Sequence, residues 1–136
     1  MGSSSSPDRY KHPSQGEQFL ISLFQYFVDI EQSQRTNFIA RRLSFHGNTL
    51  GSLALSYNPA RRAPYEAILD HEHFHHVSPA FAKRFQRPDE SEEQYVERLR
   101  QELEDKFLEL GPDTIIGCKW NPSNALSCVL IPSSRR

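Results

Sequence analysis

The segment TNFIARRLSFHGNTLGSLAL, residues 36–55, decides the fold class of this chain. Residues 36–40 (TNFIA) end in three apolar residues and include strand-forming types, so they predict a strand. A polar turn that contains Gly47 follows, and the apolar run at residues 50–55 predicts a short helix. With a helix expected before it at residues 17–32, the order of helix, link, strand, glycine turn and helix is typical of an α/β fold built on a parallel sheet.

The helix expected at residues 17–32 has one broad apolar face. Its members recur with the spacing of a single helix side, and they are Phe19, Leu20, Leu23, Phe24, Phe27 and Val28. This face needs a covering partner, and the strand that follows Arg35 is the nearest candidate.

A second long helix is expected at residues 91–110. Ser91 and Gln94 have the spacing of a capping box, and Gly111 followed by Pro112 is a typical helix end. An apolar stripe runs along it, made of Tyr95, Leu99, Leu103, Phe107 and Leu110. We also expect an ion pair between Glu102 and Lys106, and a second strand at residues 113–116.

The other segments carry weaker signals. Residues 1–16 predict a disordered lead-in, residues 57–64 an ordered loop, and residues 65–69 a short helix. Irregular chain is expected at residues 71–79 and in a tail at 117–136. Two strands alone form a marginal sheet in water, so we expect low solubility or self-association.

Composition excludes several classes of function. The chain has 136 residues and a net charge of −1, which gives no electrostatic basis for binding nucleic acid or an anionic membrane. It has no run of 18 apolar residues that could span a membrane. Cys118 and Cys128 follow no secretory leader and lack a metal-type spacing, so we expect free thiols in a reducing compartment, the cytoplasm.

The turn Phe45-His46-Gly47 is the first candidate site. Open α/β sheets bind ligands beyond the carboxyl ends of their strands, where an aromatic ring offers a flat face and glycine permits close approach. The alternative is a core phenylalanine beside a surface histidine, and the residues alone favour this alternative.

Two further patterns could carry chemistry. His71, Glu72 and His75 match the H-E-x-x-H zinc signature, but Pro79 follows closely and no apolar stripe supports the helix that such a site needs. A solvated histidine-rich loop is therefore the favoured interpretation. The pair Arg61 and Arg62 could bind a carboxylate or phosphate, although a solvated pair is the simpler reading. The chain has neither a Gly-x-Ser-x-Gly elbow nor a glycine-rich phosphate loop.

The order of these segments resembles class III pyridoxal-phosphate-dependent aminotransferases. The similarity spans about residues 25–116 and is carried by residues 34–42, 44–51, 60–65, 76–79, 95–99 and 110–114. It implies an incomplete piece of the family's large domain (residues 17–116), a mostly parallel sheet flanked by helices. By position, Phe45 would stack on the pyridoxal ring, with His46 and Gly47 beside it.

The chain also departs from the family. The Ser-Gly-Ser-Glu-Ala phosphate cup is replaced by HPSQGE at residues 12–17, and the Asp-Glu-Val segment that binds the ring nitrogen is missing. No lysine occurs in the Schiff-base context; the lysines are Lys11, Lys83, Lys106 and Lys119. The resemblance therefore implies a transaminase acting on an amine or keto acid, present here as a fragment that binds pyridoxal phosphate weakly and is inactive on its own.

Two alternatives stay open. The chain could be a non-catalytic fragment that docks through its amphipathic helices, by self-association or on a full-length relative. It could also be a zinc hydrolase that uses His71, Glu72 and His75.

Overall fold

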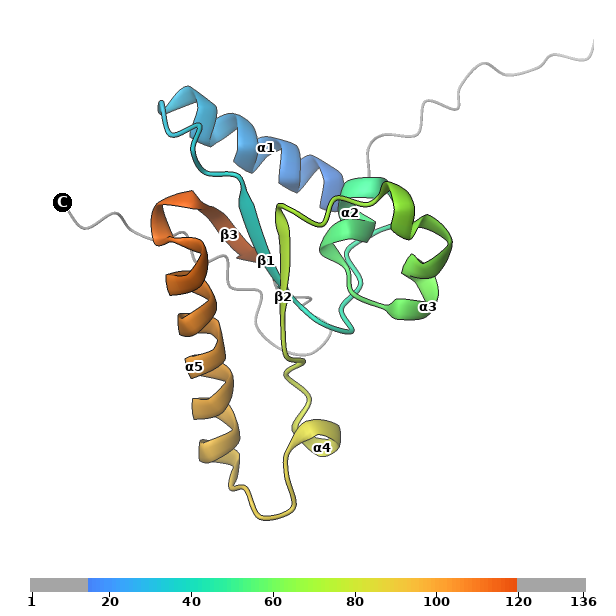
Figure 1. Ribbon diagram of the computed structural model, residues 1–136, viewed down its shortest axis with the longest axis vertical. Coiled ribbons are helices and arrows are strands. Elements are labelled where there is room, and N and C mark those ends of the chain that lie inside the picture. The colour runs from blue at the N-terminus through green and yellow to red at the C-terminus, as the bar shows by residue number, and fades with distance from the viewer. Residues whose placement is uncertain (1–14, 120–136) are drawn as a thin grey trace, which may run out of the picture.

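A three-stranded parallel sheet forms the centre of the molecule (Figure 1). The computed structural model describes residues 15–119. Strand β1 (Asn37–Arg41) lies between β2 (Phe74–Val77) and β3 (Ile115–Lys119). The prediction of an α/β fold with a parallel sheet flanked by helices is confirmed.

One helix precedes the first strand, and the others lie in the two connections between strands. They are α1 (Gln15–Asp29), α2 (Leu50–Leu55), α3 (Pro59–Arg62), α4 (Ala82–Phe85) and α5 (Glu92–Leu110), with two 3-10 helices, η1 (Ala63–Ile68) and η2 (Pro112–Thr114). Within the described residues, none of these helices combines the length and the apolar character needed to cross a membrane.

The side chains of β1 alternate between two cores because successive residues of a strand point to opposite faces. Phe38 and Ala40 pack with α1 and α2, in a cluster completed by Leu20, Phe27, Leu55 and Ile116. Ile39 faces α5, in a cluster with Val77, Ile115 and Cys118 against which Leu103, Phe107 and Leu110 pack. Both faces of the central strand are therefore covered, as expected for a parallel sheet.

Helix α5 matches the sequence prediction closely. Ser91 Oγ accepts from Gln94 N, and the Gln94 side chain accepts from Ser91 N, which completes the capping box. Leu103, Phe107 and Leu110 of the apolar stripe pack on the sheet, and Tyr95 and Leu99 are buried. Docking through this helix stays a prediction. The predicted pair of Glu102 with Lys106 is wrong: Glu102 accepts from the Ser78 backbone N–H and hydroxyl at 3.0 Å each, and Lys106 pairs with Glu109 at 2.6 Å.

Removal of this cap is expected to weaken the fold measurably. Ser91→Ala should lower the free energy of unfolding by about 1 kcal/mol, because the N–H of Gln94 loses its acceptor. Urea denaturation followed by circular dichroism measures the change. Ser33→Ala, in an exposed turn, is the control and should change stability by less than about 0.5 kcal/mol. Equal losses in the two variants would contradict the capping role.

Several segment predictions need correction. Residues 71–79 are not wholly irregular, because β2 lies within them, and the loop expected at 57–64 contains α3. The short helix at 65–69 is instead the 3-10 helix η1. The tail expected from residue 117 begins later, since β3 continues to Lys119, and α1 begins at Gln15 and ends at Asp29. The remainder of the lead-in and of the tail, including Cys128, lies outside the described residues.

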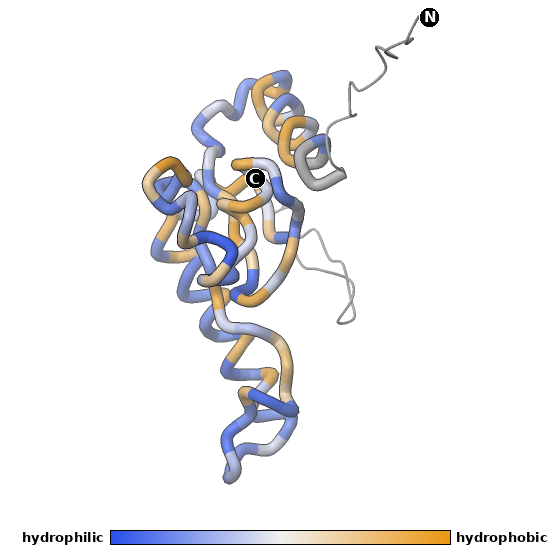
Figure 2. The backbone as a smooth tube through the Cα atoms, turned by 90° about the vertical axis from the view of Figure 1, so that its right-hand side faces the viewer, coloured by the Kyte–Doolittle hydropathy of each residue, from blue (hydrophilic) through white to orange (hydrophobic). Residues whose placement is uncertain are grey.

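Helix α1 carries a second apolar stripe that faces solvent. Ile21, Phe24 and Val28 are 60%, 43% and 46% exposed, whereas Leu20 and Phe27 on the neighbouring stripe are buried. Hydrophobic colour runs along this helix in Figure 2. The expectation of self-association, or of docking on a full-length relative, stays a prediction.

Candidate functional site

The candidate site lies where β1 ends and the chain turns toward α2. Parallel strands present their carboxyl ends at one edge, and this edge is the usual ligand side of an open α/β sheet. Arg42 N donates to Val77 O at 2.8 Å and Leu43 N to Tyr57 O at 2.7 Å, so the turn is tied to β2 and to the segment after α2. Gly47 has a φ of 134°, a conformation that side-chain-bearing residues rarely adopt.

A chain of hydrogen bonds fixes the orientation of His46 inside this turn. Ser44 Oγ donates to Arg41 O at 2.6 Å and lies 2.9 Å from His46 Nε2. Because the hydroxyl proton is already engaged, the imidazole must donate from Nε2. The His46 backbone N–H donates to Ser56 Oγ at 2.8 Å, and Ser56 Oγ donates to Ser52 O at 2.7 Å.

Two histidines at this edge are held in the neutral form. Burial is the main cause that lowers the pKa of His46 to about 4, with smaller contributions in the same direction from the charge of Lys119 and from the neighbouring imidazole of His76. Burial likewise lowers the pKa of His76 to about 4, while its Nε2–H donates to Leu55 O at 3.0 Å. Near neutral pH both rings therefore act as hydrogen-bond donors within the fold, and neither carries a charge.

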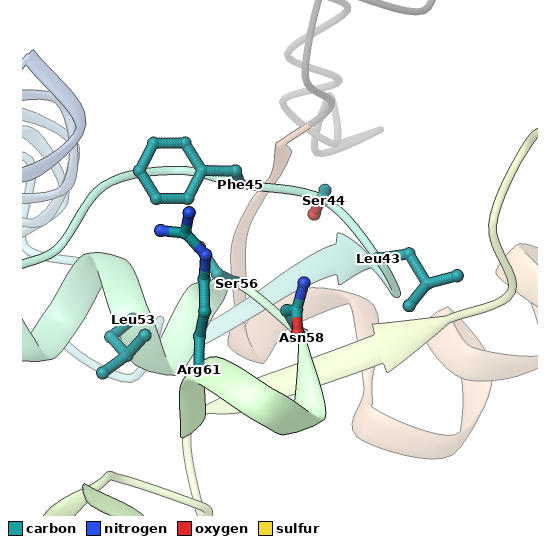
Figure 3. A pocket seen from close by; sticks show the side chains of 7 residues that line it. All are labelled: Leu43, Ser44, Phe45, Leu53, Ser56, Asn58 and Arg61. Carbon is teal, nitrogen blue, oxygen red and sulfur yellow. The ribbon is translucent and has the colours of Figure 1, made fainter. Parts of the chain in front are cut away.

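Phe45 stands beside a cavity of about 200 Å³ (Figure 3). Its side chain is 46% exposed, in contrast to His46, which is 8% exposed. The cavity is lined by Leu43, Ser44, Phe45, Leu53, Ser56, Asn58 and Arg61. Arg61 Cζ lies 4.9 Å from the centroid of the Phe45 ring, so the guanidinium covers part of that ring, as Figure 3 shows.

The structure separates the two arginines that the sequence presents as a pair. Arg62 is buried, donates to Ala54 O at 3.2 Å and to Ser56 O at 3.1 Å, and forms an ion pair with Glu66 at 3.3 Å. Arg61 is exposed and contacts the ring of Phe45. Arg62 is therefore a structural residue, whereas Arg61 belongs to the cavity. The four-residue spacing between Arg62 and Glu66, which is typical of an ion pair on a helix, is the sequence signal that could have distinguished the two arginines.

The zinc-hydrolase alternative is not favoured by the described part of the chain. His71 precedes β2 and lies 3.0 Å from Glu66 O, while His75 lies within β2 and contacts Asn37 Oδ1 at 3.0 Å. The two imidazoles therefore do not share a helix face, and no group of three metal-ligating side chains occurs among the residues described.

One lysine of the described chain reaches the candidate site. Lys83 lies on α4 and Lys106 on α5, whereas Lys119 ends β3 opposite Ala40 of β1. Its charge contributes to the lowered pKa of His46, and burial lowers the pKa of Lys119 itself. Sequence reasoning missed this placement because it ended the second strand at residue 116. Lys11 lies outside the described residues.

Comparison with curated proteins identifies aminotransferase relatives, although no family model matches the chain. It is 39% identical over 99 residues to an uncharacterized aminotransferase of Schizosaccharomyces pombe, covering 73% of this chain and 21% of that protein. An aminotransferase of Gibberella zeae is 42% identical over 93 residues, which cover 67% of this chain and 18% of that protein. A probable gamma-aminobutyrate transaminase 3, mitochondrial, of Oryza sativa is 34% identical over 119 residues, with 82% and 22% covered.

Solved structures show the same relationship. The omega transaminase of Pseudomonas jessenii in complex with PMP matches 75% of this chain and 22% of its own, with a TM-score of 0.70 and 29% identity. An omega-transferase from Vibrio fluvialis matches 79% of this chain and 25% of its own, with a TM-score of 0.69 and 26% identity. The chain has the fold of part of a transaminase. It spans about a fifth of the length of the curated relatives it matches.

Proposed function

We propose that this chain is a piece of a class III pyridoxal-phosphate-dependent transaminase that, on its own, binds the cofactor weakly and does not turn over. The observation that supports it most is the turn Phe45-His46-Gly47 beside a cavity at the carboxyl edge of the sheet, in a chain whose relatives are named aminotransferases. The substrate class of the whole enzyme would be a small amine or keto acid, as the transaminase names of the relatives suggest.

The residues around the cavity fit a flat, anionic ring. Phe45 provides an aromatic face of the kind that stacks on a second ring, and Arg61 and Asn58 provide donors for an anion. Gly47 leaves the backbone of the turn accessible. The hydrogen bonds that His46 donates to Ser44 Oγ and Ser56 Oγ hold the turn, so the direction of the Phe45 ring is set before any ligand arrives.

The same cavity lacks the groups that turnover requires. Pyridoxal phosphate supplies an electron sink, but the protein must provide an amine for the carbonyl group and an anion for the ring nitrogen. No lysine and no carboxylate occurs among the described residues that line the cavity. Binding without catalysis is the behaviour that these side chains support.

This proposal predicts measurable but weak cofactor binding by the purified chain. Isothermal titration with pyridoxal phosphate should show one weak site, and Phe45→Ala should raise the Kd by about 2- to 10-fold, because a stacked ring pair contributes about 0.5–1.5 kcal/mol. Phe81→Ala is the matched control, since Phe81 is 44% exposed and lies far from the turn in the sequence. With an amino donor, we expect no formation of keto product.

Two results would overturn separate parts of the proposal. A stoichiometric absorbance band that borohydride fixes, together with amino-donor turnover, would show that the chain is active. Equal affinity of wild type and Phe45→Ala would show that Phe45 is not the ring platform. The cytoplasmic location expected from the cysteines stays a prediction.

A further inference from the structure

We propose that Arg61 makes the cavity beside Phe45 a binding site for the carboxylate of a small molecule with an apolar body. The inference rests on the proposed function and deepens it, because it assigns the carboxylate of such an acid to a named donor in the same cavity.

The first argument is the state of the Arg61 guanidinium. In the part of the chain that the structure describes, Arg61 forms no ion pair, in contrast to Arg62 and Arg98. Glu66, the acidic residue of the following 3-10 helix, is directed to Arg62 and to His71 instead. The fork of N–H donors on Arg61 is therefore available to an external anion, and its planar geometry matches a carboxylate in a bidentate arrangement.

The second argument is that the guanidinium is held in place. Its Cζ lies 4.9 Å from the centroid of the Phe45 ring, and α3 fixes the backbone of Arg61 between Pro59 and Arg62. A cation that already rests on an aromatic face loses less conformational freedom when it binds an anion. The position of the charge is thus set before the ligand binds.

The third argument concerns the other polar groups of the cavity. The hydroxyl protons of Ser44 and Ser56 are donated to Arg41 O and Ser52 O, so neither hydroxyl can donate to an anion without losing an internal bond. Asn58 precedes α3 and makes no capping bond with its side chain. Arg61 and Asn58 are therefore the donors that can meet a ligand, and both lie on one side of the cavity in Figure 3.

The walls and the size of the cavity define the rest of the ligand. Phe45, Leu43 and Leu53 supply apolar surface to the same cavity. A volume of about 200 Å³ is smaller than a typical drug site, so the occupant is of metabolite size. A small aromatic or aliphatic acid meets both requirements.

The test uses benzoate as the probe and nuclear magnetic resonance as the readout. Titration of the full chain should shift the backbone signals of Phe45, Asn58 and Arg61 in a saturable way. Arg61→Gln should raise the Kd by about tenfold or more, the effect of losing a charged hydrogen-bond donor. Arg61→Lys keeps the charge without the fork and should give an intermediate Kd.

Arg84→Gln is the matched control. Arg84 is exposed on α4, and its Cζ lies 5.5 Å from the Phe85 ring, so it repeats the arginine–phenylalanine contact without the cavity. Its Kd for benzoate should equal that of wild type. Equal weakening by Arg84→Gln and Arg61→Gln, or signal shifts confined to another surface, would overturn the site.

Two related probes examine the chemistry. Benzyl alcohol has the same ring without the charge and should not bind at the same concentrations; equal binding would overturn the role of the anion. Phenyl phosphate should compete with benzoate, because the fork of Arg61 matches phosphate and carboxylate alike; absence of competition would overturn Arg61 as the anion donor of the cavity. Neither result depends on pyridoxal phosphate, so failure here is distinguishable from failure of the proposed function.

Discussion

Replacement of Arg62 by alanine is expected to lower the free energy of unfolding by about 2–3 kcal/mol, a large part of the stability of a small domain. Arg62 is buried, and its Nη1 donates to two backbone carbonyls, Ala54 O and Ser56 O. Loss of the side chain removes the charged donor of these two carbonyls and the packing of the guanidinium 5.0 Å from the Tyr57 ring centroid. Urea denaturation followed by circular dichroism measures the change.

Arg61→Ala provides the control at the adjacent position. Arg61 is exposed, so its removal should change the free energy of unfolding by less than about 0.5 kcal/mol. If Arg62→Ala does not fold, Arg62→Met keeps part of the apolar stem and gives a measurable transition that should still lie well below the wild type. Similar losses at both positions would contradict the division of this pair into a structural and a ligand-facing residue.

Local signals made some elements predictable. In α5, the cap Ser91, the partner Gln94 and the terminal Gly111 are all near neighbours in the sequence, and the structure uses each of them as expected. Strand β1 is equally local, since three consecutive buried residues, Phe38, Ile39 and Ala40, need both faces covered. Element type followed from the sequence where the decisive interactions lie within a few residues.

Strand β2 could not be predicted because its stability comes from distant partners. Two of its four residues are histidines, which are not typical strand formers. Its register pairs Phe74 with Phe38, and the two rings stack at 5.5 Å between centroids. His75 and His76 contact Asn37 Oδ1 and Leu55 O, groups that lie 38 and 21 residues away in the sequence. A histidine-rich run therefore looks like a solvated loop until these partners are in place.

The candidate site was predictable in position but not in detail. The end of β1 located Phe45 at the ligand edge of the sheet, as the structure shows. Nothing local indicated that Ser44 and Ser56 would hold His46, because Ser56 approaches only after α2 turns the chain back. Lys119 reaches this edge through the pairing of β3 with β1, which no residue near it in the sequence could reveal.

The buried histidines lead to the second large prediction, a loss of stability on mild acidification. In the folded state the pKa values of His46 and His76 are lowered to about 4, below the ordinary value of about 6.5 for an unfolded chain. The unfolded state therefore takes up these protons first as the pH falls. The stabilising contribution of each neutral imidazole is complete above about pH 6.5, declines between about pH 6.5 and 4, and is absent below that range.

The titration of His46 alone should make the free energy of unfolding about 2 kcal/mol lower at pH 5 than at pH 7.5. The titration of His76 acts in the same direction. Glu90, whose pKa is lowered to about 2 by Arg98, titrates below this window and does not explain the loss.

Urea denaturation at pH 7.5 and pH 5 measures the difference. His46→Gln keeps a side-chain donor for Ser44 Oγ but cannot titrate, so its stability should fall by about 2 kcal/mol less between the two pH values. His71→Gln removes an imidazole that is 53% exposed and is the control for replacing a histidine by glutamine. A wild-type stability that stays constant from pH 7.5 to pH 5 would show that His46 is solvated. The turn that carries Phe45 at this edge of the sheet would then not be held as the structure describes.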